Sequence, residues 1–272
     1  EGINEAGQLI MIKDEANAGV ITGVSDGTLD LVDFDNDGDL DLVVSGDSFD
    51  GDVLKLYRND EGQYTSISET LSGLAAMKNG RTSWGDFDGD GNADMLYSGE
   101  VVGKGEFTGL ALYDQVTRTY KEDDFDLSQF TNAAVAFGDY DGDNDLDLFV
   151  GGSIVPGEYP KIPTSYLLEN DGGGFFKIVT STVAPELQKI GMVSDAKWAD
   201  FNGDGLEDIV VVGEWMGIKI LINENGKFSD KSDEFLDDAY KGWWNTIDVN
   251  DLDGDGDMDV VSSAFAAGDI AW

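Results

Sequence analysis

Five nine-residue segments of this 272-residue chain carry an acidic residue at almost every second position. They read DFDNDGDLD from Asp33, DFDGDGNAD from Asp86, DYDGDNDLD from Asp139, DFNGDGLED from Asp200 and DLDGDGDMD from Asp251. Like charges this close together repel one another at neutral pH, and a hard cation with oxygen ligands would relieve the repulsion. The spacing therefore indicates metal binding, and its chemistry favours calcium.

The shared pattern, D-x-[DN]-x-D-[GN]-x-x-D, offers side-chain oxygens at loop positions 1, 3, 5 and 9. Ca²⁺ takes roughly six to eight oxygens at flexible angles, whereas Mg²⁺ keeps more water. Position 6 requires positive φ, and it is glycine in four loops and Asn144 in the third. Asn202 places a neutral oxygen at position 3 of the fourth loop and should weaken that site slightly. Position 7 is expected to ligate through its backbone carbonyl, which belongs to Asp39, Asn92, Asp145, Leu206 and Asp257.

Two other interpretations compete with a strand–loop–strand calcium site. An EF-hand requires a bidentate glutamate at position 12, but here that position is apolar, aromatic or serine: Val44, Tyr97, Val150, Val211 and Ser262. The second alternative is a set of solvated acidic turns without metal. Five copies with ligand-type spacing argue against it.

The loops recur at spacings of 53, 53, 61 and 51 residues, a period typical of solenoids, arrays or propellers. An apolar stretch enters each loop, a β-rich run such as DLVVSG leaves it, and a third apolar run, a glycine turn and a short fourth strand follow in most repeats. This pattern predicts an all-β fold, a β-propeller of four-stranded antiparallel blades in one domain. A β-sandwich and an extended array of small sheets are the alternatives. The blades are expected at about 27–70, 80–122, 132–182, 193–231, and 243–272 together with 1–14.

Ring closure is suggested by the two ends of the chain. After the fifth loop come only two strand-like runs, DVVSS and DIAW, whereas the N-terminal GQLIMIK resembles an isolated fourth strand. The segment INEAGQL from Ile3 also resembles the hairpin INENGKF from Ile222. We therefore expect residues 8–13 to complete the fifth blade and remove its exposed edge.

The composition restricts the possible functions. Lys and Arg total 16 against 56 acidic residues, a formal charge of −40, which argues against nucleic acid or anionic membrane as partners. There is no histidine and no cysteine, so the commonest general base, disulfides and thiolate metal sites are excluded. No apolar run reaches the roughly 18 residues of a membrane span. The N-terminus lacks a signal-peptide pattern, so a signal peptide is expected either to be removed already or never to have existed.

With these motifs in place, the sequence resembles the FG-GAP/VCBS repeat family, whose calcium-loaded blades also build integrin α-subunit propellers. The segments GMVSDAKWADFNGDGLEDIVVVGEW and GWWNTIDVNDLDGDGDMDVV are most similar to bacterial secreted relatives of cartilage acidic protein. The resemblance implies secretion and about five Ca²⁺ ions. Integrin-type rings usually have seven blades, so either this ring is smaller or the chain is part of something larger. The ligands that the resemblance implies are Asp33, Asp35, Asp37, Asp41, Asp86, Asp88, Asp90, Asp94, Asp139, Asp141, Asp143, Asp147, Asp200, Asn202, Asp204, Asp208, Asp251, Asp253, Asp255 and Asp259.

A second candidate site comes from aromatic residues in the insertions between strands. Tyr159 lies in the longest insertion, Trp215 in GEWMG, and Trp243 and Trp244 open the fifth repeat. Core packing is one explanation for each of them. The other is an aromatic platform for a sugar ring or a peptide.

No catalytic residue can be assigned. Ser153 has no histidine to activate it, and no pair of carboxylates stands out for glycoside hydrolysis, so a non-enzymatic protein is expected. Two functions remain open. The first is a secreted, calcium-stabilised adhesion or binding module that recognises a glycan or protein through its loop face. The second is a structural subunit of a filament, in which propellers associate through exchange of their terminal strands.

Overall fold

The computed structural model describes residues 2–3, 9–10, 19–123, 127, 133–155, 157–236, 242–254, 256, 258–264 and 270–271. Antiparallel strands dominate this part of the chain, which confirms the predicted all-β class. The helical segments there are single turns: η1 (Ser68–Leu71), α1 (Thr180–Val183), η2 (Pro185–Lys189) and α2 (Ser232–Phe235). None of the described helices has the length and apolar character needed to cross a membrane.

Within the described residues, β3 to β21 fall into five consecutive antiparallel meanders, referred to below as the first to fifth sheets, and an Asp-rich loop joins the first strand of each to the second. The first sheet comprises β3 (Ser25–Val32), β4 (Asp41–Ser48), β5 (Gly51–Asp60) and β6 (Gln63–Ser66). The second comprises β7 (Met77–Gly85), β8 (Asp94–Val101), β9 (Gly105–Asp114) and β10 (Thr119–Glu122).

The other three sheets repeat this order. The third comprises β11 (Ala134–Gly138), β12 (Asp147–Gly151), β13 (Tyr166–Asn170) and β14 (Phe176–Ile178). The fourth comprises β15 (Met192–Ala199), β16 (Asp208–Met216), β17 (Lys219–Asn223) and β18 (Phe228–Asp230). The fifth comprises β19 (Gly242–Asn250), β20 (Asp259–Ala264) and β21 (Ile270–Ala271). A bridge at Val53–Met77 joins the first sheet to the second, and bridges at Glu214–Trp243 and Met216–Gly242 join the fourth to the fifth.

The apolar core lies between successive sheets, because the second strands are apolar on both faces. On β8, Met95 and Tyr97 pack toward the first sheet, whereas Leu96 packs toward the third. On β16, Ile209 and Val211 pack toward the third sheet, and the two valines that alternate with them pack toward the fifth. Strands buried on both faces read as continuous apolar runs rather than as alternating ones.

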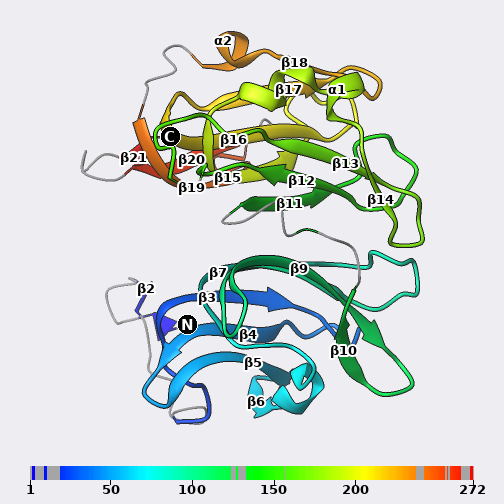
Figure 1. Cartoon of the computed structure of the whole chain (residues 1–272), viewed down its shortest axis with the longest axis vertical. Helices are drawn as coiled ribbons and strands as arrows, with labels where there is room; N and C mark the ends of the chain where they lie inside the picture. The colour runs from blue at the N-terminus through cyan, green and yellow to red at the C-terminus, as the bar shows by residue number, and fades with distance from the viewer. Residues whose placement is uncertain are drawn as a thin grey trace.

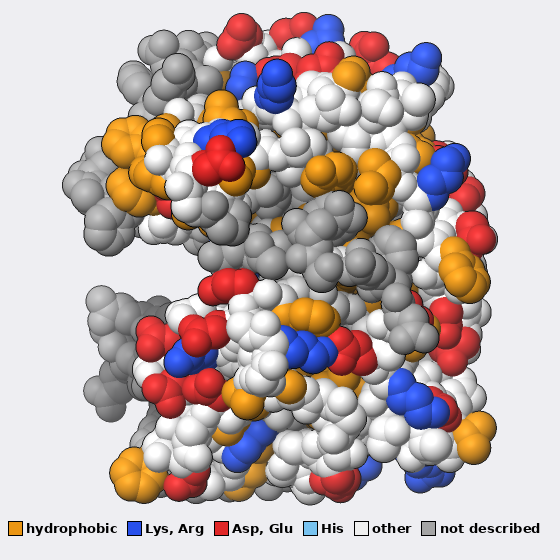
Figure 2. Space-filling model, in the orientation of Figure 1, with side chains coloured by type: hydrophobic (Ala, Val, Ile, Leu, Met, Phe, Trp, Pro, Cys, Tyr) orange, Lys and Arg blue, Asp and Glu red, His pale blue; other side chains and the backbone are white. Residues whose placement is uncertain are grey.

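The first strands of the sheets lie next to one another in chain order: β3 packs on β7, β7 on β11, β11 on β15 and β15 on β19. The molecule therefore resembles a propeller, with the first two sheets in one half and the other three in the second half (Figure 1). A cleft opens between the halves on the side of β2 and β21 (Figure 2). In the described residues the sheets do not close into a ring.

The expected pairing of the N-terminal segment is wrong where the structure describes it. β2 (Leu9–Ile10) pairs with β1 (Gly2–Ile3) in a separate two-stranded sheet, and the fifth sheet ends at β21. A local hairpin closes a shorter loop and satisfies the same backbone groups at a lower entropic cost. Residue 8 and residues 11–13 lie outside the described part of the chain.

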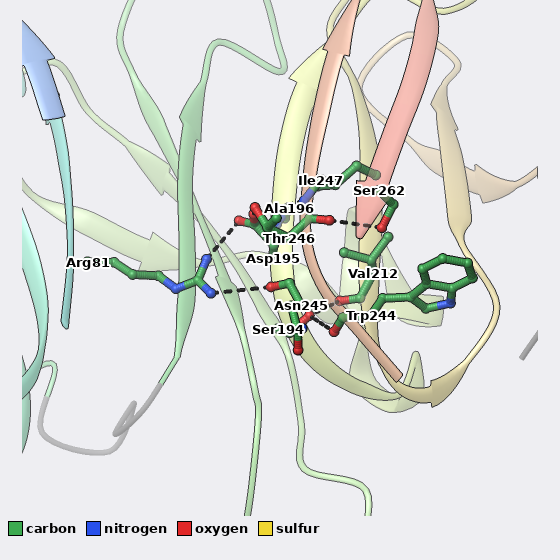
Figure 3. A network of polar contacts seen from close by, with 10 residues as sticks. All are labelled: Arg81, Ser194, Asp195, Ala196, Val212, Trp244, Asn245, Thr246, Ile247 and Ser262. Carbon is green, nitrogen blue, oxygen red and sulfur yellow. Dashed lines mark hydrogen bonds and ion pairs between the residues drawn. The ribbon is translucent and has the colours of Figure 1, made fainter. Parts of the chain in front are cut away.

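One polar network ties the two halves together (Figure 3). Arg81 Nη1 on β7 lies 3.1 Å from Asp195 Oδ1 on β15, and Nη2 donates to the carbonyl oxygen of Asn245 on β19 at 3.5 Å. Asp195 Oδ2 also accepts hydrogen bonds from Thr246 Oγ1 (2.6 Å) and the backbone N–H of Ile247 (3.1 Å). Arg81 therefore connects the second sheet directly to the fourth and fifth.

Candidate metal loops and an aromatic binding site

The aspartate at loop position 1 organises the turn of each Asp-rich loop. In the first loop, the backbone N–H of Asp37 donates to Asp33 Oδ1 (3.1 Å) and that of Gly38 to Asp33 Oδ2 (3.0 Å). The second, third and fourth loops repeat both bonds, and in the fifth the N–H of Gly256 donates to Asp251 Oδ2 (3.1 Å). Position 6 has positive φ in all five loops, between +72° at Asn144 and +98° at Gly256, as the sequence predicts.

The aspartate at position 9 connects the loop to the sheet. Asp94 Oδ2 accepts the N–H of Phe87 in the loop (3.0 Å), and Asp94 Oδ1 accepts the N–H of Tyr113 on the third strand (2.7 Å). The first, third and fourth loops show the same two bonds at Asp41, Asp147 and Asp208. These four side chains are almost completely buried, so they fasten the loop to the meander as well as offering oxygen to a cation.

Burial without a counter-charge changes the acidity of these carboxyls. Loss of hydration raises the pKa of Asp94 and that of Asp147 to about 7, although backbone N–H groups oppose the shift. Burial also raises the pKa of Asp41 and of Asp208. A cation in the loop would offset this cost by stabilising the ionised form.

The donor geometry could hold a metal ion. In four loops, three carboxylates offer oxygens within 4.8 Å of one another: Asp33, Asp35 and Asp37; Asp86, Asp88 and Asp90; Asp139, Asp141 and Asp147; and Asp251, Asp253 and Asp259. The fourth loop does not bring three carboxylates together in this way, and it is the loop in which Asn202 replaces one of them. An all-oxygen donor set with a carboxylate majority is the chemistry of a hard divalent cation. Asp255 and Asp257 of the fifth loop lie outside the described residues.

The EF-hand alternative is incompatible with the surrounding structure. The position-12 residues lie within β4, β8, β12, β16 and β20, and each is at most 1% exposed: Val44, Tyr97, Val150, Val211 and Ser262. A residue fixed inside a strand in this way cannot act as the twelfth ligand of a helix–loop–helix site.

Three of the four predicted aromatic residues come together at the far end of β16 from its Asp-rich loop. Trp215 Nε1 donates to Tyr159 Oη (2.8 Å), which donates in turn to Glu214 Oε2 (3.2 Å). The ring centroids of Trp215 and Trp243 lie 5.5 Å apart at an interplanar angle of 43°. All three rings are exposed: Trp215 by 61%, Tyr159 by 49% and Trp243 by 38%.

Trp244 does not belong to this group. Its side chain is 6% exposed, packs between the fourth and fifth sheets, and donates through Nε1 to the carbonyl oxygen of Met216 (3.1 Å). Core packing, the other explanation that the sequence leaves open, is therefore correct for this residue.

A cavity of about 540 Å³ adjoins the aromatic residues. Its lining is largely apolar, with Glu214 and Lys219 as the charged members and Pro160, Ile162, Ile190, Gly191, Met192, Trp215, Met216 and Gly217 as the others. Apolar pockets with a few fixed polar groups are typical of small-ligand sites. Trp215 has φ of +59°, a left-handed conformation that is unfavourable for a bulky side chain and is found mainly at functional positions.

Sequence reasoning misses several residues around these sites. An acidic residue follows Gly46 and Gly99 as Glu214 follows Gly213, but this repetition does not predict the contact with Tyr159, because only the tertiary fold brings the two side chains together. Asn170 and Asn223 donate to carbonyl oxygens of the preceding sheet, and each ends the third strand of its own sheet, in YLLEN and KILIN, so this repetition is a signal that could find them.

Comparison with known proteins agrees with the repeat pattern. A family model described as an FG-GAP-like repeat matches residues 33–97 and 200–262, which together contain four of the five Asp-rich loops. No curated protein matches the chain. Among solved structures, a lectin of Agrocybe aegerita, described as recognising non-reducing terminal N-acetylglucosamine, has a similar fold with a TM-score of 0.56 and 19% identity. The alignment covers 87% of this chain and 60% of the lectin chain, so this chain spans less than two thirds of the lectin's length.

Proposed function

Because FG-GAP-like repeats account for four of its five Asp-rich loops, we propose that this chain is a calcium-stabilised β-propeller that binds glycans and catalyses no reaction. In this proposal the chain is a single domain of five blades, each built on one of the five sheets. Secretion is part of the proposal, since calcium sites of modest affinity fill in extracellular fluid, where dissociation constants of about 10⁻⁴–10⁻³ M suffice.

The group of Trp215, Tyr159 and Trp243 beside the cavity is the observation that carries the binding function. A pyranose ring has an apolar face that packs on indole or phenol rings, and hydroxyl edges that need polar partners. Here the exposed rings supply the packing surface, and Glu214 supplies an acceptor at its edge. The hydrogen bonds from Trp215 to Tyr159 and from Tyr159 to Glu214 fix the orientation of the rings before a ligand arrives, which lowers the entropic cost of binding.

The shared fold supports the ligand class but not the position of the site. A lectin described as recognising non-reducing terminal N-acetylglucosamine has a similar backbone, so a glycan is a reasonable first ligand to test.

Calcium has a structural role in this proposal. Side-chain oxygens at loop positions 1, 3, 5 and 9 would hold the ion, whose charge compensates the clustered aspartates. The aromatic group lies at the opposite end of the nine-residue β16 from Asp208, so the ion and the ligand do not share a contact residue. Calcium therefore supports ligand binding only through the stability of the sheets.

Glycan-array screening followed by titration calorimetry on the best ligand tests the binding function. Trp215→Ala and Trp243→Ala should each weaken binding at least about tenfold, as loss of an aromatic anchor does. Phe175→Ala is the matched control, since Phe175 is an exposed aromatic residue in the turn between β13 and β14, away from the cavity. If no glycan binds, or if Phe175→Ala weakens binding as much as Trp215→Ala, the proposed site is wrong.

A further inference from the structure

The cavity of about 540 Å³ beside the aromatic residues is apolar where its lining is buried. Met192 and Met216 are 4% and 6% exposed, and the partly buried Ile190 lies with them in the lining. Gly191 lies so close to Met216 that a Cβ at this position would collide with the sulfur atom, so glycine fits there and a larger residue does not. Methionine side chains are flexible and polarisable, so this part of the cavity can adapt to apolar groups of different shape.

The two charged residues of the lining already have partners. Lys219 Nζ on β17 donates to Asp230 Oδ2 on the adjacent strand β18 at 2.6 Å. Glu214 Oε2 accepts the hydroxyl group of Tyr159 at 3.2 Å. A sugar hydroxyl deep in the cavity would therefore lose its hydrogen bonds to water with little to replace them, which is unfavourable. A sugar ring can pack on the exposed aromatic rings, but it is poorly suited to fill the cavity.

The cavity is continuous with the surface on which the sugar is proposed to lie. Trp215 belongs both to the aromatic group and to the lining of the cavity. Ile162, which also lines the cavity, is 51% exposed and so lies at its mouth. A ligand that packs on the ring of Trp215 therefore reaches apolar surface that water covers in the free protein, and burial of that surface favours binding.

Charge restricts the head group of a ligand with an apolar part. The chain carries a formal charge of −40, and Glu214 lies at the edge of the aromatic group. A fatty acid or an anionic lipid would bring a further negative charge to this edge, where Lys219 is already paired with Asp230. An uncharged sugar avoids this repulsion, and its hydroxyl groups can donate to Glu214.

We propose that the ligand of this site is a glycoside with an apolar chain, of the kind found in neutral glycolipids. The proposal rests on the glycan binding proposed above and adds the part of the ligand that enters the cavity. The sugar packs on Trp215 and Trp243, and the alkyl or acyl chain enters the cavity past Ile162 toward Met192 and Met216. Neither part alone uses the whole site.

Titration calorimetry of the 272-residue chain in calcium tests the proposal. The probes are the methyl, butyl and hexyl β-glycosides of glucose, galactose and N-acetylglucosamine, each below the concentration at which it forms micelles. Every methylene group that enters the cavity should raise the affinity about three- to fourfold, as burial of a CH₂ group does. The hexyl glycoside of the preferred sugar should therefore bind at least about thirtyfold more tightly than the methyl glycoside.

Three variants locate the chain and the sugar separately. Trp243 belongs to the aromatic group but not to the cavity lining, so Trp243→Ala should weaken the methyl and hexyl glycosides by the same factor. Ile162→Asp places a charge at the mouth and should lower the ratio of hexyl to methyl affinity at least about tenfold. Ile178→Asp is the matched control, because Ile178 on β14 is 48% exposed and lies outside the cavity lining, and it should keep the wild-type ratio. Circular dichroism confirms that the variants fold.

The contrary results are distinguishable. Equal affinities for the methyl and hexyl glycosides overturn this proposal and leave glycan binding intact. A hexyl advantage that Ile162→Asp does not reduce also overturns it, since the chain then lies elsewhere. If none of these glycosides binds, this proposal is wrong, and the glycan array decides separately on the proposed function. Hexyl tri(ethylene glycol) carries the same chain on an uncharged head group without a sugar. An affinity equal to that of the hexyl glycoside would show that the sugar contributes nothing and would overturn both proposals.

Discussion

Arg81 and Asp195 form an ion pair whose two members lie in different environments. The side chain of Arg81 is 43% exposed, whereas that of Asp195 is 12% exposed and also accepts hydrogen bonds from Thr246 and Ile247. Removal of the exposed arginine costs little, because an exposed ion pair contributes little to stability. Removal of the buried carboxylate costs more, because it leaves several hydrogen-bond donors without an acceptor. The pair should therefore respond unequally to the removal of each partner.

We expect Asp195→Ala to lower the free energy of unfolding by about 2–3 kcal/mol, because the N–H of Ile247 then lacks an acceptor. Arg81→Ala should cost less than about 1 kcal/mol relative to wild type, although it leaves Asp195 without its counter-charge. Urea denaturation in saturating calcium measures both values. Equal effects of the two changes would show that the ion pair itself, rather than the hydrogen bonds of Asp195, stabilises the contact.

Chelation of calcium should lower the melting temperature strongly. Binding to the native state alone stabilises it by about 2.7 kcal/mol per site at a hundredfold excess over the dissociation constant. Differential scanning calorimetry with and without excess chelator measures the shift, and re-addition of calcium is the control for reversibility. An identical melting curve in chelator would contradict a structural role for the metal.

A single position-5 substitution should remove one site and leave the fold intact. Asp90→Ala takes one of three converging carboxylates from the second loop, while the strands on either side keep their pairing. Calorimetric stoichiometry should fall by one. Asp50→Ala is the control: it removes one negative charge from the exposed turn between β4 and β5, outside the Asp-rich loops, and should leave the stoichiometry unchanged.

Position 9 should behave differently from position 5. Asp94→Ala removes the acceptor for the backbone N–H groups of both Phe87 and Tyr113, and each buried donor left unpaired costs about 1–3 kcal/mol. We expect Asp94→Ala to destabilise the protein even in chelator, where Asp90→Ala has little effect. Urea denaturation of the two variants in chelator is the comparison, and equal stability there would mean that position 9 is only a metal ligand.

The neighbouring tryptophans of β19 should separate stability from binding. Trp244→Ala opens a cavity in the core and should cost about 3–5 kcal/mol. Trp243→Ala removes an exposed ring, so it should lower the free energy of unfolding by less than about 1 kcal/mol but weaken ligand binding. Thermal melts together with calorimetric titrations distinguish the two effects. A destabilised Trp243→Ala would place this ring in the core instead.

The features that sequence predicts well here are local ones. The turn at Gly38 or Asn144 follows from neighbouring residues alone, and so does the strand that begins at Asp41. The choice between Trp243 and Trp244 is not local, because adjacent residues of a strand point to opposite faces and only the register of β19 assigns them. The predicted pairing of the N-terminal segment is wrong for a related reason, because its apolar pattern is compatible with a strand whichever partner it pairs with.

Contacts between distant repeats leave even less trace in the sequence. Arg81 and Asp195 each lie five positions before their loops, so the repeat aligns them but does not show that they are partners, and Tyr159 meets Trp215 only because the insertion after β12 folds toward the end of β16. The repeat period predicts what the five units share. The proposed binding site depends instead on residues that individual repeats do not share, such as Tyr159 and Trp215.

The left-handed backbone at Trp215 sets stability against ligand binding at this position. Glycine adopts φ of +59° without strain, so Trp215→Gly would relieve about 1–3 kcal/mol of local backbone strain while removing the largest exposed ring of the site. A laboratory selection for thermal tolerance alone would therefore favour loss of this tryptophan. Its persistence under random mutagenesis should depend on whether the selected trait is heat resistance or ligand capture.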